Sequence, residues 1–181
     1  MNYINQMTIV FDAISQNEGF ARSTVAAFCV MLGPTLDEIT DIKTAVSEAV
    51  TNCVVHAYPN GKGKIEIWVG LTQNTVHIAV RDDGVGIADF EQARQPFFST
   101  KEGEERAGMG FTVMESFMDT LNLSTRKSGG VEVLMTKKIK GIQKIGGLNA
   151  VLWAKHTINK TGTKWRPTRK GFTYSTKLSA C

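Results

Sequence analysis

Cysteine, proline and long apolar runs are all scarce in this chain of 181 residues. The three cysteines, Cys29, Cys53 and Cys181, are an odd number without the spacing of metal ligands, so they indicate small buried side chains in a reducing compartment. No stretch approaches the roughly 20 apolar residues that a membrane span needs, and no basic segment precedes an apolar run at the amino terminus. We therefore expect a cytoplasmic protein that has no membrane partner.

Acidic residues are absent from one end of the chain. Residues 1–136 hold 10 of the 21 Lys and Arg residues and all 17 Asp and Glu residues, whereas residues 137–181 hold the other 11 basic residues. We expect one globular domain over residues 1–140 and a basic, poorly ordered tail over residues 141–181. Such a tail could attract nucleic acid electrostatically, but an unstructured and nonspecific tail is the simpler interpretation, and we expect no direct nucleic-acid partner.

The apolar pattern before the tail alternates between the two periods of regular structure. Alternation with period two predicts strands at about residues 7–11, 65–69, 76–80 and 131–135. Spacings of three and four predict helices at about residues 15–32, 35–56 and 111–121. The first two helices each begin with a capping-box pattern, Ser15 to Glu18 and Thr35 to Glu38. The order predicts an α+β fold, a two-layer α/β sandwich with helices on one face of a mainly antiparallel sheet.

Glu48 and Asn52 form the first candidate motif. Four residues apart on the expected second helix, their side chains lie on the same face. A carboxylate can accept a proton, and a neutral amide oxygen can ligate a hard cation such as Mg²⁺. A solvated polar face would give the same pattern, and is the better interpretation of this motif alone.

Asp82, Gly84 and Gly86 form the second motif, at the end of the strand expected over residues 76–80. A carboxylate there can accept a hydrogen bond from an exocyclic amine such as that of adenine, and the glycines let the backbone approach a flat ligand. An ordinary Asp-Gly turn is the alternative.

Gly108, Met109 and Gly110 form the third motif, directly before the helix expected from residue 111. A glycine-rich helix start exposes backbone N–H groups, and the helix dipole there favours an anion such as phosphate. Lys101 and Arg106 could add charge-assisted hydrogen bonds to phosphate oxygens. A flexible glycine-rich helix start is an equally good interpretation of this motif alone.

Taken together and in order, the three motifs supply the parts of a Mg-nucleotide site. The chain has no Gly-x-x-x-x-Gly-Lys-Ser/Thr stretch and neither the His-Arg-Asp nor the Asp-Phe-Gly motif of eukaryotic-type kinases. A P-loop enzyme and a eukaryotic-type kinase are therefore excluded.

The same motifs carry a family resemblance. Residues 46–52 with 56–58 resemble the N box of the GHKL superfamily, and residues 82–86 and 108–111 resemble its two glycine boxes. Residues 16–22, 91–96 and 117–119 are similar to the anti-sigma-F factors of endospore-forming bacteria. The resemblance covers about residues 7–138 and implies the Bergerat fold of that superfamily.

The resemblance implies a role for each matching residue. Glu48 would be the general base that takes the proton of a serine hydroxyl on an anti-anti-sigma factor, Asn52 would ligate Mg²⁺, and Asp82 would recognise adenine. Further contacts to ATP or ADP are implied for a larger set: Thr51, Gly84, Gly86, Lys101, Arg106, Gly108, Met109 and Gly110. Residues 89–107 would form an ATP lid, and Arg22 would hold the protein partners.

The implied activity is that of an ATP-dependent protein serine kinase that also binds and inhibits a sigma factor of the sigma-F type, as a homodimer. A binding module without kinase activity, a related stress-response anti-sigma kinase and the detached ATPase domain of a histidine kinase are the alternatives.

Two features depart from the family pattern. Val131 stands after Gly130 where many members have a threonine whose hydroxyl helps to read adenine, so we expect weaker adenine binding. The tail also lies outside the pattern, and a shifted reading frame, a strain-specific extension and a real appendage would each fit.

Overall fold

A computed structural model of the chain describes residues 2–59, 62–95, 109–141, 166–168 and 171–173. The chain divides into two units, Met1–Gly141 and Ile142–Cys181, and each is described by itself. The expected elements before the tail lie in the first unit.

The first unit is built on a five-stranded sheet in which every neighbouring pair is antiparallel. Its strands are, in spatial order, β1 (Asn5–Asp12), β2 (Lys64–Leu71), β3 (Thr75–Asp82), β5 (Val131–Lys138) and β4 (Thr120–Thr125). Alternate residues of these strands point into the core, as Ile65, Ile67 and Val69 do on β2. The four strands expected from the sequence are confirmed.

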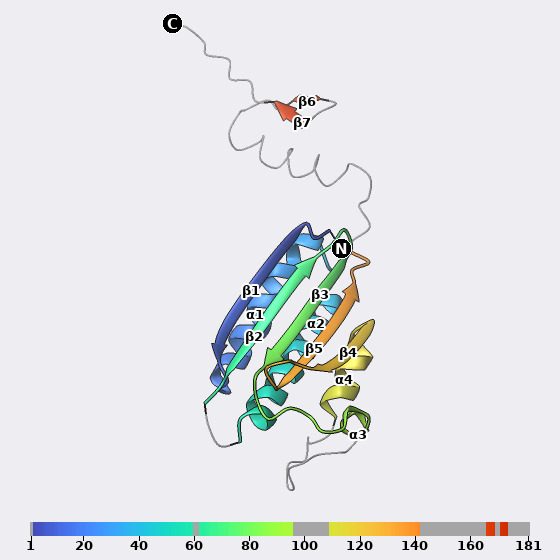
Figure 1. Cartoon of the computed structure of the whole chain (residues 1–181). Helices are drawn as coiled ribbons and strands as arrows, with labels where there is room; N and C mark the ends of the chain where they lie inside the picture. The colour runs from blue at the N-terminus through green and yellow to red at the C-terminus, as the bar shows by residue number, and fades with distance from the viewer. Residues whose placement is uncertain (1, 60–61, 96–108, 142–165, 169–170, 174–181) are drawn as a thin grey trace, which may run out of the picture. The chain divides into compact units, whose positions relative to one another are not determined.

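Helices cover one face of this sheet (Figure 1). They are α1 (Gln16–Cys29), α2 (Leu36–Asn52) and α4 (Gly110–Phe117), with a 3-10 turn at Val30–Leu32 and a π-helical turn at Cys53–Ala57. The core between the two layers contains fully buried side chains from each: Val25, Ile42, Val46, Met114, Ile67, Ile78 and Met135. Burying each such side chain contributes about 1.5–3 kcal/mol. The α+β two-layer sandwich is confirmed.

The two expected capping boxes have different outcomes. At Thr35 the box is complete, because the Thr35 hydroxyl accepts the Glu38 N–H at 3.2 Å and Glu38 Oε2 accepts the Thr35 N–H at 2.8 Å. At Ser15 the expected box is wrong: Ser15 makes no side-chain cap hydrogen bond. Both halves of the box have other partners, because the Glu18 N–H donates to the Ser15 carbonyl oxygen at 3.2 Å and the Glu18 carboxylate accepts a hydrogen bond from Ser47 on α2.

The third helix is shorter than the sequence pattern predicts. α4 ends at Phe117, Met118 takes an extended backbone conformation, and the chain enters β4. Leu121, expected on the helix, pairs instead with Met135 of β5. Leu121 and Leu123 fit period two as well as the tail of a helical series, so pairing with β5 decides the structure.

A short helix interrupts the segment expected as a loop. α3 (Phe90–Arg94) is capped by Asp89, whose Oδ1 accepts the Gln92 N–H at 3.0 Å. α3 therefore occupies the start of the expected ATP lid, and residues 96–108 of that lid lie outside the described residues.

Within the second unit, β6 (Arg166–Thr168) and β7 (Gly171–Thr173) pair as a short antiparallel ladder. The prediction of a poorly ordered tail otherwise falls outside the described residues and stays a prediction. In the part of the chain that the structure describes, no helix is both long and apolar enough to cross a membrane.

Candidate functional site

A pocket of about 570 Å³ lies where the end of α2, the end of β3 and the start of α4 meet. Its lining comes from stretches that are far apart in the sequence, and includes Asn52, Cys53, His56, Ala57, Asp82, Gly86, Ile87, Asp89, Gln92, Gly110, Phe111, Val131 and Val133. One predicted residue or more from each of the three sequence motifs contributes to it. The fold thus brings the three motifs together around one cavity.

The candidate base and metal ligand lie against the first turn of α4. A Cβ added at Gly110 would lie 3.1 Å from both side-chain polar atoms of Asn52 and 3.3 Å from Glu48 Oε2. These contacts are tighter than most side-chain contacts, so glycine at this position allows α4 to begin beside the two polar groups. A carboxylate and an amide therefore adjoin a helix start, where the dipole favours anions.

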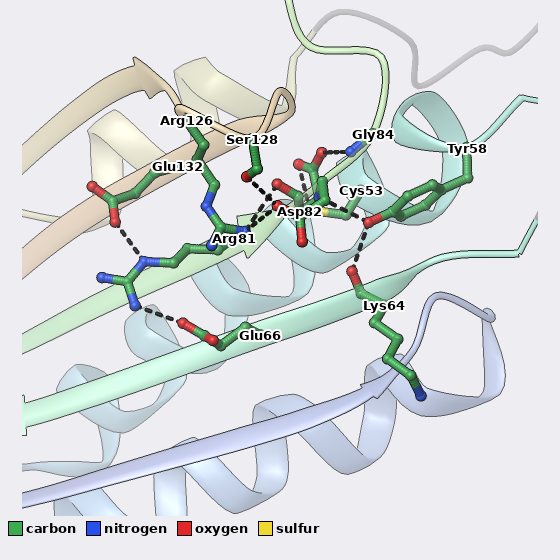
Figure 2. Close-up of polar contacts among 11 residues, drawn as sticks. Cys53, Tyr58, Lys64, Glu66, Arg81, Asp82, Gly84, Arg126, Ser128 and Glu132 are labelled. Atoms are coloured by element: carbon green, nitrogen blue, oxygen red, sulfur yellow. Dashed lines mark hydrogen bonds and ion pairs between the residues drawn. The ribbon is translucent and has the colours of Figure 1, made fainter.

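Asp82 is the buried carboxylate of the pocket, with only 3% of its surface exposed. Its Oδ1 accepts the Gly84 N–H at 2.9 Å, and its Oδ2 lies 3.6 Å from Cys53 Sγ, within hydrogen-bond reach of a thiol donor. Figure 2 shows both contacts meeting at the carboxylate, one from the loop and one from the π-helical turn after α2. A buried carboxylate at a pocket wall, held by donors on both oxygens, can accept a further hydrogen bond from a ligand amine.

The glycines after Asp82 are required by close packing and by backbone conformation. A Cβ at Gly84 would lie 2.2 Å from the Ala57 carbonyl oxygen, and Gly86 has φ of +77°. The Val85 N–H donates to the same Ala57 oxygen at 3.0 Å. The loop is thereby fastened to the end of the π-helical turn, and its backbone forms a wall of the pocket.

Asp83, next to the buried carboxylate, fastens the loop on its other side. Its Oδ1 accepts hydrogen bonds from Arg126 Nη1 and Ser128 Oγ, each at 2.7 Å. Its N–H donates at 2.9 Å to the Tyr58 hydroxyl. That hydroxyl in turn donates to the Lys64 carbonyl oxygen at 2.7 Å (Figure 2). Sequence reasoning missed this set of contacts, because they join residues up to 45 positions apart and follow no local pattern.

The turn before β5 passes close to the backbone of Asp82. Gly130 has φ of +74°, and a Cβ there would lie 2.2 Å from the Asp82 carbonyl oxygen. Val131 follows it, is buried and lines the pocket with an apolar side chain. The weaker adenine binding expected from Val131 stays a prediction.

The other predicted site residues differ in their placement. Thr51 is exposed and is not part of the pocket lining, and Met109 is the exposed N-cap residue of α4. Lys101, Arg106 and Gly108 lie outside the described residues. Their proposed nucleotide contacts stay predictions.

Arg22 lies on α1, with 44% of its side chain exposed. Its Nη1 is 3.2 Å from Glu18 Oε1 and donates to Ser47 Oγ at 3.4 Å. Ser47 directly precedes Glu48 on α2. The predicted partner-binding arginine is therefore tied to the helix that carries the predicted base.

Comparison with known proteins agrees with this geometry. The model of the histidine kinase-like ATPase domain family matches residues 14–137. The anti-sigma F factor of Bacillus licheniformis is 53% identical over 136 residues, which are 75% of this chain and 93% of that protein. The anti-sigma F factor of Caldanaerobacter subterraneus subsp. tengcongensis is 55% identical over 139 residues, which are 77% of this chain and 97% of that protein. The chain belongs to the anti-sigma F factor family. The resemblance that its motifs carry is thus confirmed.

Family membership gives the chain an ATPase domain of the histidine kinase-like type, and hence a nucleotide-binding fold. The RsbU and RsbW domains of a Mycobacterium tuberculosis protein share this fold, with a TM-score of 0.53 and 20% identity over 75% of this chain and 32% of that one. All predicted site residues fall within residues 14–137, whereas residues 141–181 fall outside the family match.

Proposed function

We propose that this chain is an ATP-dependent protein serine kinase that phosphorylates an anti-anti-sigma factor, and that it also binds and inhibits a sigma factor of the sigma-F type. Inhibition would block formation of the RNA polymerase holoenzyme. The observation that carries the proposal is the convergence of Glu48 and Asn52 on the first turn of α4, beside a pocket whose buried carboxylate is Asp82.

ATP and ADP are the ligands that fit this pocket best. The Asp82 carboxylate accepts the exocyclic amine of adenine, and the apolar side chains of Ile87 and Val133 line the space for the ring. The phosphates extend toward the first turn of α4, where the N-cap residue Met109 makes no side-chain hydrogen bond to the free N–H groups.

Mg²⁺ fits the donors beside that helix start. Asn52 offers a neutral amide oxygen next to the carboxylate of Glu48, and oxygen donors are what Mg²⁺ prefers. Asn52 is the ligand we assign, and the bound ion would neutralise charge on the phosphate oxygens. Glycine at position 110 leaves the space between the two side chains and α4 that a larger residue would fill.

Glu48 acts as the general base in this proposal. Its carboxylate accepts the proton of the partner's serine hydroxyl while the serine oxygen bonds to the γ-phosphorus, the bond from that phosphorus to the bridging oxygen breaks, and ADP leaves. A positioned general base contributes about 10²- to 10⁴-fold in rate.

Sigma-factor binding is proposed from the curated relatives, which are named anti-sigma F factors. Arg22 is the partner-binding residue that we assign, and its exposure on α1 makes its guanidinium available to a protein surface. The homodimer is a further expectation, which sedimentation of the full chain tests.

Incubation of the full chain with Mg-ATP and the candidate anti-anti-sigma factor should yield phosphoserine on that partner. Glu48→Gln should abolish the product, and normal phosphorylation by this variant would show that Glu48 is not the base. Persistent sigma-factor binding without phosphoserine on any tested partner would favour the second candidate, a nucleotide-dependent binding module.

A further inference from the structure

The thiol of Cys53 lies directly behind the carboxylate to which the proposed function assigns adenine recognition. Cys53 is the first residue of the π-helical turn that follows Asn52, and its side chain is 4% exposed. Its Sγ is 3.6 Å from Asp82 Oδ2, and both residues line the nucleotide pocket. Two consecutive residues therefore adjoin the two ends of the proposed ligand: Asn52, the last residue of α2, at the phosphates, and Cys53 at the adenine.

The Asp82 carboxylate has two hydrogen-bond donors among the residues that the structure describes, one on each oxygen. Oδ1 accepts the Gly84 backbone N–H, and Oδ2 accepts the Cys53 thiol. Rotation of the carboxylate would break both contacts and leave a charge buried without partners, which is costly. The two donors therefore hold the carboxylate plane and direct the remaining lone pairs.

Of the two donors to Asp82, only Cys53 donates through its side chain, since Gly84 donates through its backbone. Val131 lines the same pocket, and its side chain has no polar atom that could donate. The Sγ–Oδ2 contact is a hydrogen bond only with the proton on the sulfur, because a carboxylate can only accept. The thiol is therefore the donor of this contact, and Asp82 is the acceptor.

We propose that Cys53 is a positioning residue that sets adenine specificity, because its S–H group fixes the Asp82 carboxylate in the orientation that accepts the exocyclic amine of adenine. This inference rests on the proposed nucleotide site. It predicts that replacing Cys53 by a residue without a donor weakens recognition of the amine selectively and leaves the contacts to ribose and phosphates unchanged.

The test compares two ligands on the full-length protein by calorimetry: Mg-ATP, and the triphosphate of purine riboside, which has hydrogen in place of the amine. The ratio of their dissociation constants isolates the contribution of the amine to binding. Wild-type protein should prefer ATP by about tenfold or more, as expected for a buried polar pair. Cys53→Ala and Cys53→Val, two variants of different volume that lack a donor, should each reduce that preference about threefold to tenfold. Cys53→Ser, which keeps a donor, should retain it within about twofold.

Cys29→Ala is the matched control, because Cys29 is equally buried in the core and does not line the pocket. It should leave the ratio unchanged even where it lowers thermal stability. An undiminished preference in both Cys53→Ala and Cys53→Val, beside a clear preference in the wild type, would overturn the role of Cys53 alone. A wild type that binds neither ligand, or binds both equally, would contradict adenine recognition by Asp82 itself and the inference with it.

Discussion

Glu38 fastens the end of the first unit to the start of α2, and its replacement by glutamine gives a sharp test of the fold. The Glu38 carboxylate is buried, and it accepts the Thr35 N–H at 2.8 Å through Oε2 and the Lys140 N–H at 2.7 Å through Oε1. Glu38→Gln keeps the shape but removes the charge and places an amide N–H₂ against one backbone donor. One of the two contacts is then lost.

The expected cost follows from the strength of such bonds. A hydrogen bond to a charged group contributes about 1.5–3 kcal/mol, so we expect Glu38→Gln to lower the free energy of unfolding by about 2 kcal/mol. For a unit of this size that loss corresponds to about 4–8 °C in Tm. Asp37→Asn is the control, because it removes a charge from the same first turn at an exposed position and should cost about 0.5 kcal/mol or less.

The hydrogen bonds of Glu38 also predict how the stability of the fold depends on pH. Burial acts to raise the pKa of Glu38, but hydrogen bonds from the backbone of Thr35, Lys140 and Gly141 and from the Thr35 hydroxyl outweigh it, and the pKa lies below its ordinary value of 4.5. The folded state therefore binds a proton less readily than the unfolded state, and the stabilisation is fully present above about pH 4.5 and is lost as pH falls through the lowered pKa.

Thermal unfolding at pH 7 and at about pH 3, followed by circular dichroism, measures both effects. The difference in Tm between the wild type and Glu38→Gln should be large at pH 7 and should shrink at about pH 3. Equal Tm values for Glu38→Gln and Asp37→Asn at pH 7, or a Tm difference that does not shrink with acid, would show that the Glu38 charge does not stabilise the fold.

Three further changes probe the pocket, the partner surface and the tail. Gly84→Ala should lower the free energy of unfolding by about 1–3 kcal/mol, because its Cβ would meet the Ala57 carbonyl oxygen at 2.2 Å, and it should abolish ATP binding in a calorimetric titration. Gly19→Ala is the control: its Cβ would meet nothing within 4 Å, so it should not destabilise the protein. Arg22→Ala should weaken sigma-factor binding about tenfold or more in a pull-down titration and leave the affinity for ATP unchanged, and full sigma-factor binding would show that the surface lies elsewhere. A chain that stops after Gly141 should unfold with the Tm of the full chain and bind ATP equally well, and loss of folding would show that the tail is required.

Local sequence patterns predicted the elements that local interactions determine. The strand alternation and the Thr35 capping box both involve residues within a few positions of one another, and both are confirmed. The Ser15 box has the same sequence form, but the carboxylate of Glu18 is engaged by Ser47, 29 residues away. A partner so distant in sequence leaves no local signal, so tertiary contact overrode the local preference.

The predicted end of the third helix was wrong for a related reason. Met118 and Leu121 are three residues apart and fit a helix, whereas Leu121 and Leu123 fit a strand. Pairing with Met135 on β5 selects the strand, and that pairing depends on the assembled sheet. Short apolar series of this kind remain ambiguous until their neighbours are known.

The site was predictable where residue type carries the chemistry. Asn52, Asp82, Gly86 and Gly110 were predicted and line the pocket. Cys53, which contacts Asp82, carried no sequence signal beyond that of a small buried residue, because its contact depends on how the end of α2 meets the end of β3.

Glu48 is assigned to the chemical step rather than to nucleotide binding, and a single-turnover measurement with Glu48→Gln tests this assignment most directly. Full-length wild type and variant are each saturated with Mg-ATP, mixed with the anti-anti-sigma factor and quenched, and phosphoserine is quantified against time. We expect Glu48→Gln to lower the rate about 10²- to 10⁴-fold and to keep the ATP dissociation constant within about threefold of the wild type. A rate that is unchanged at saturating ATP would contradict this assignment.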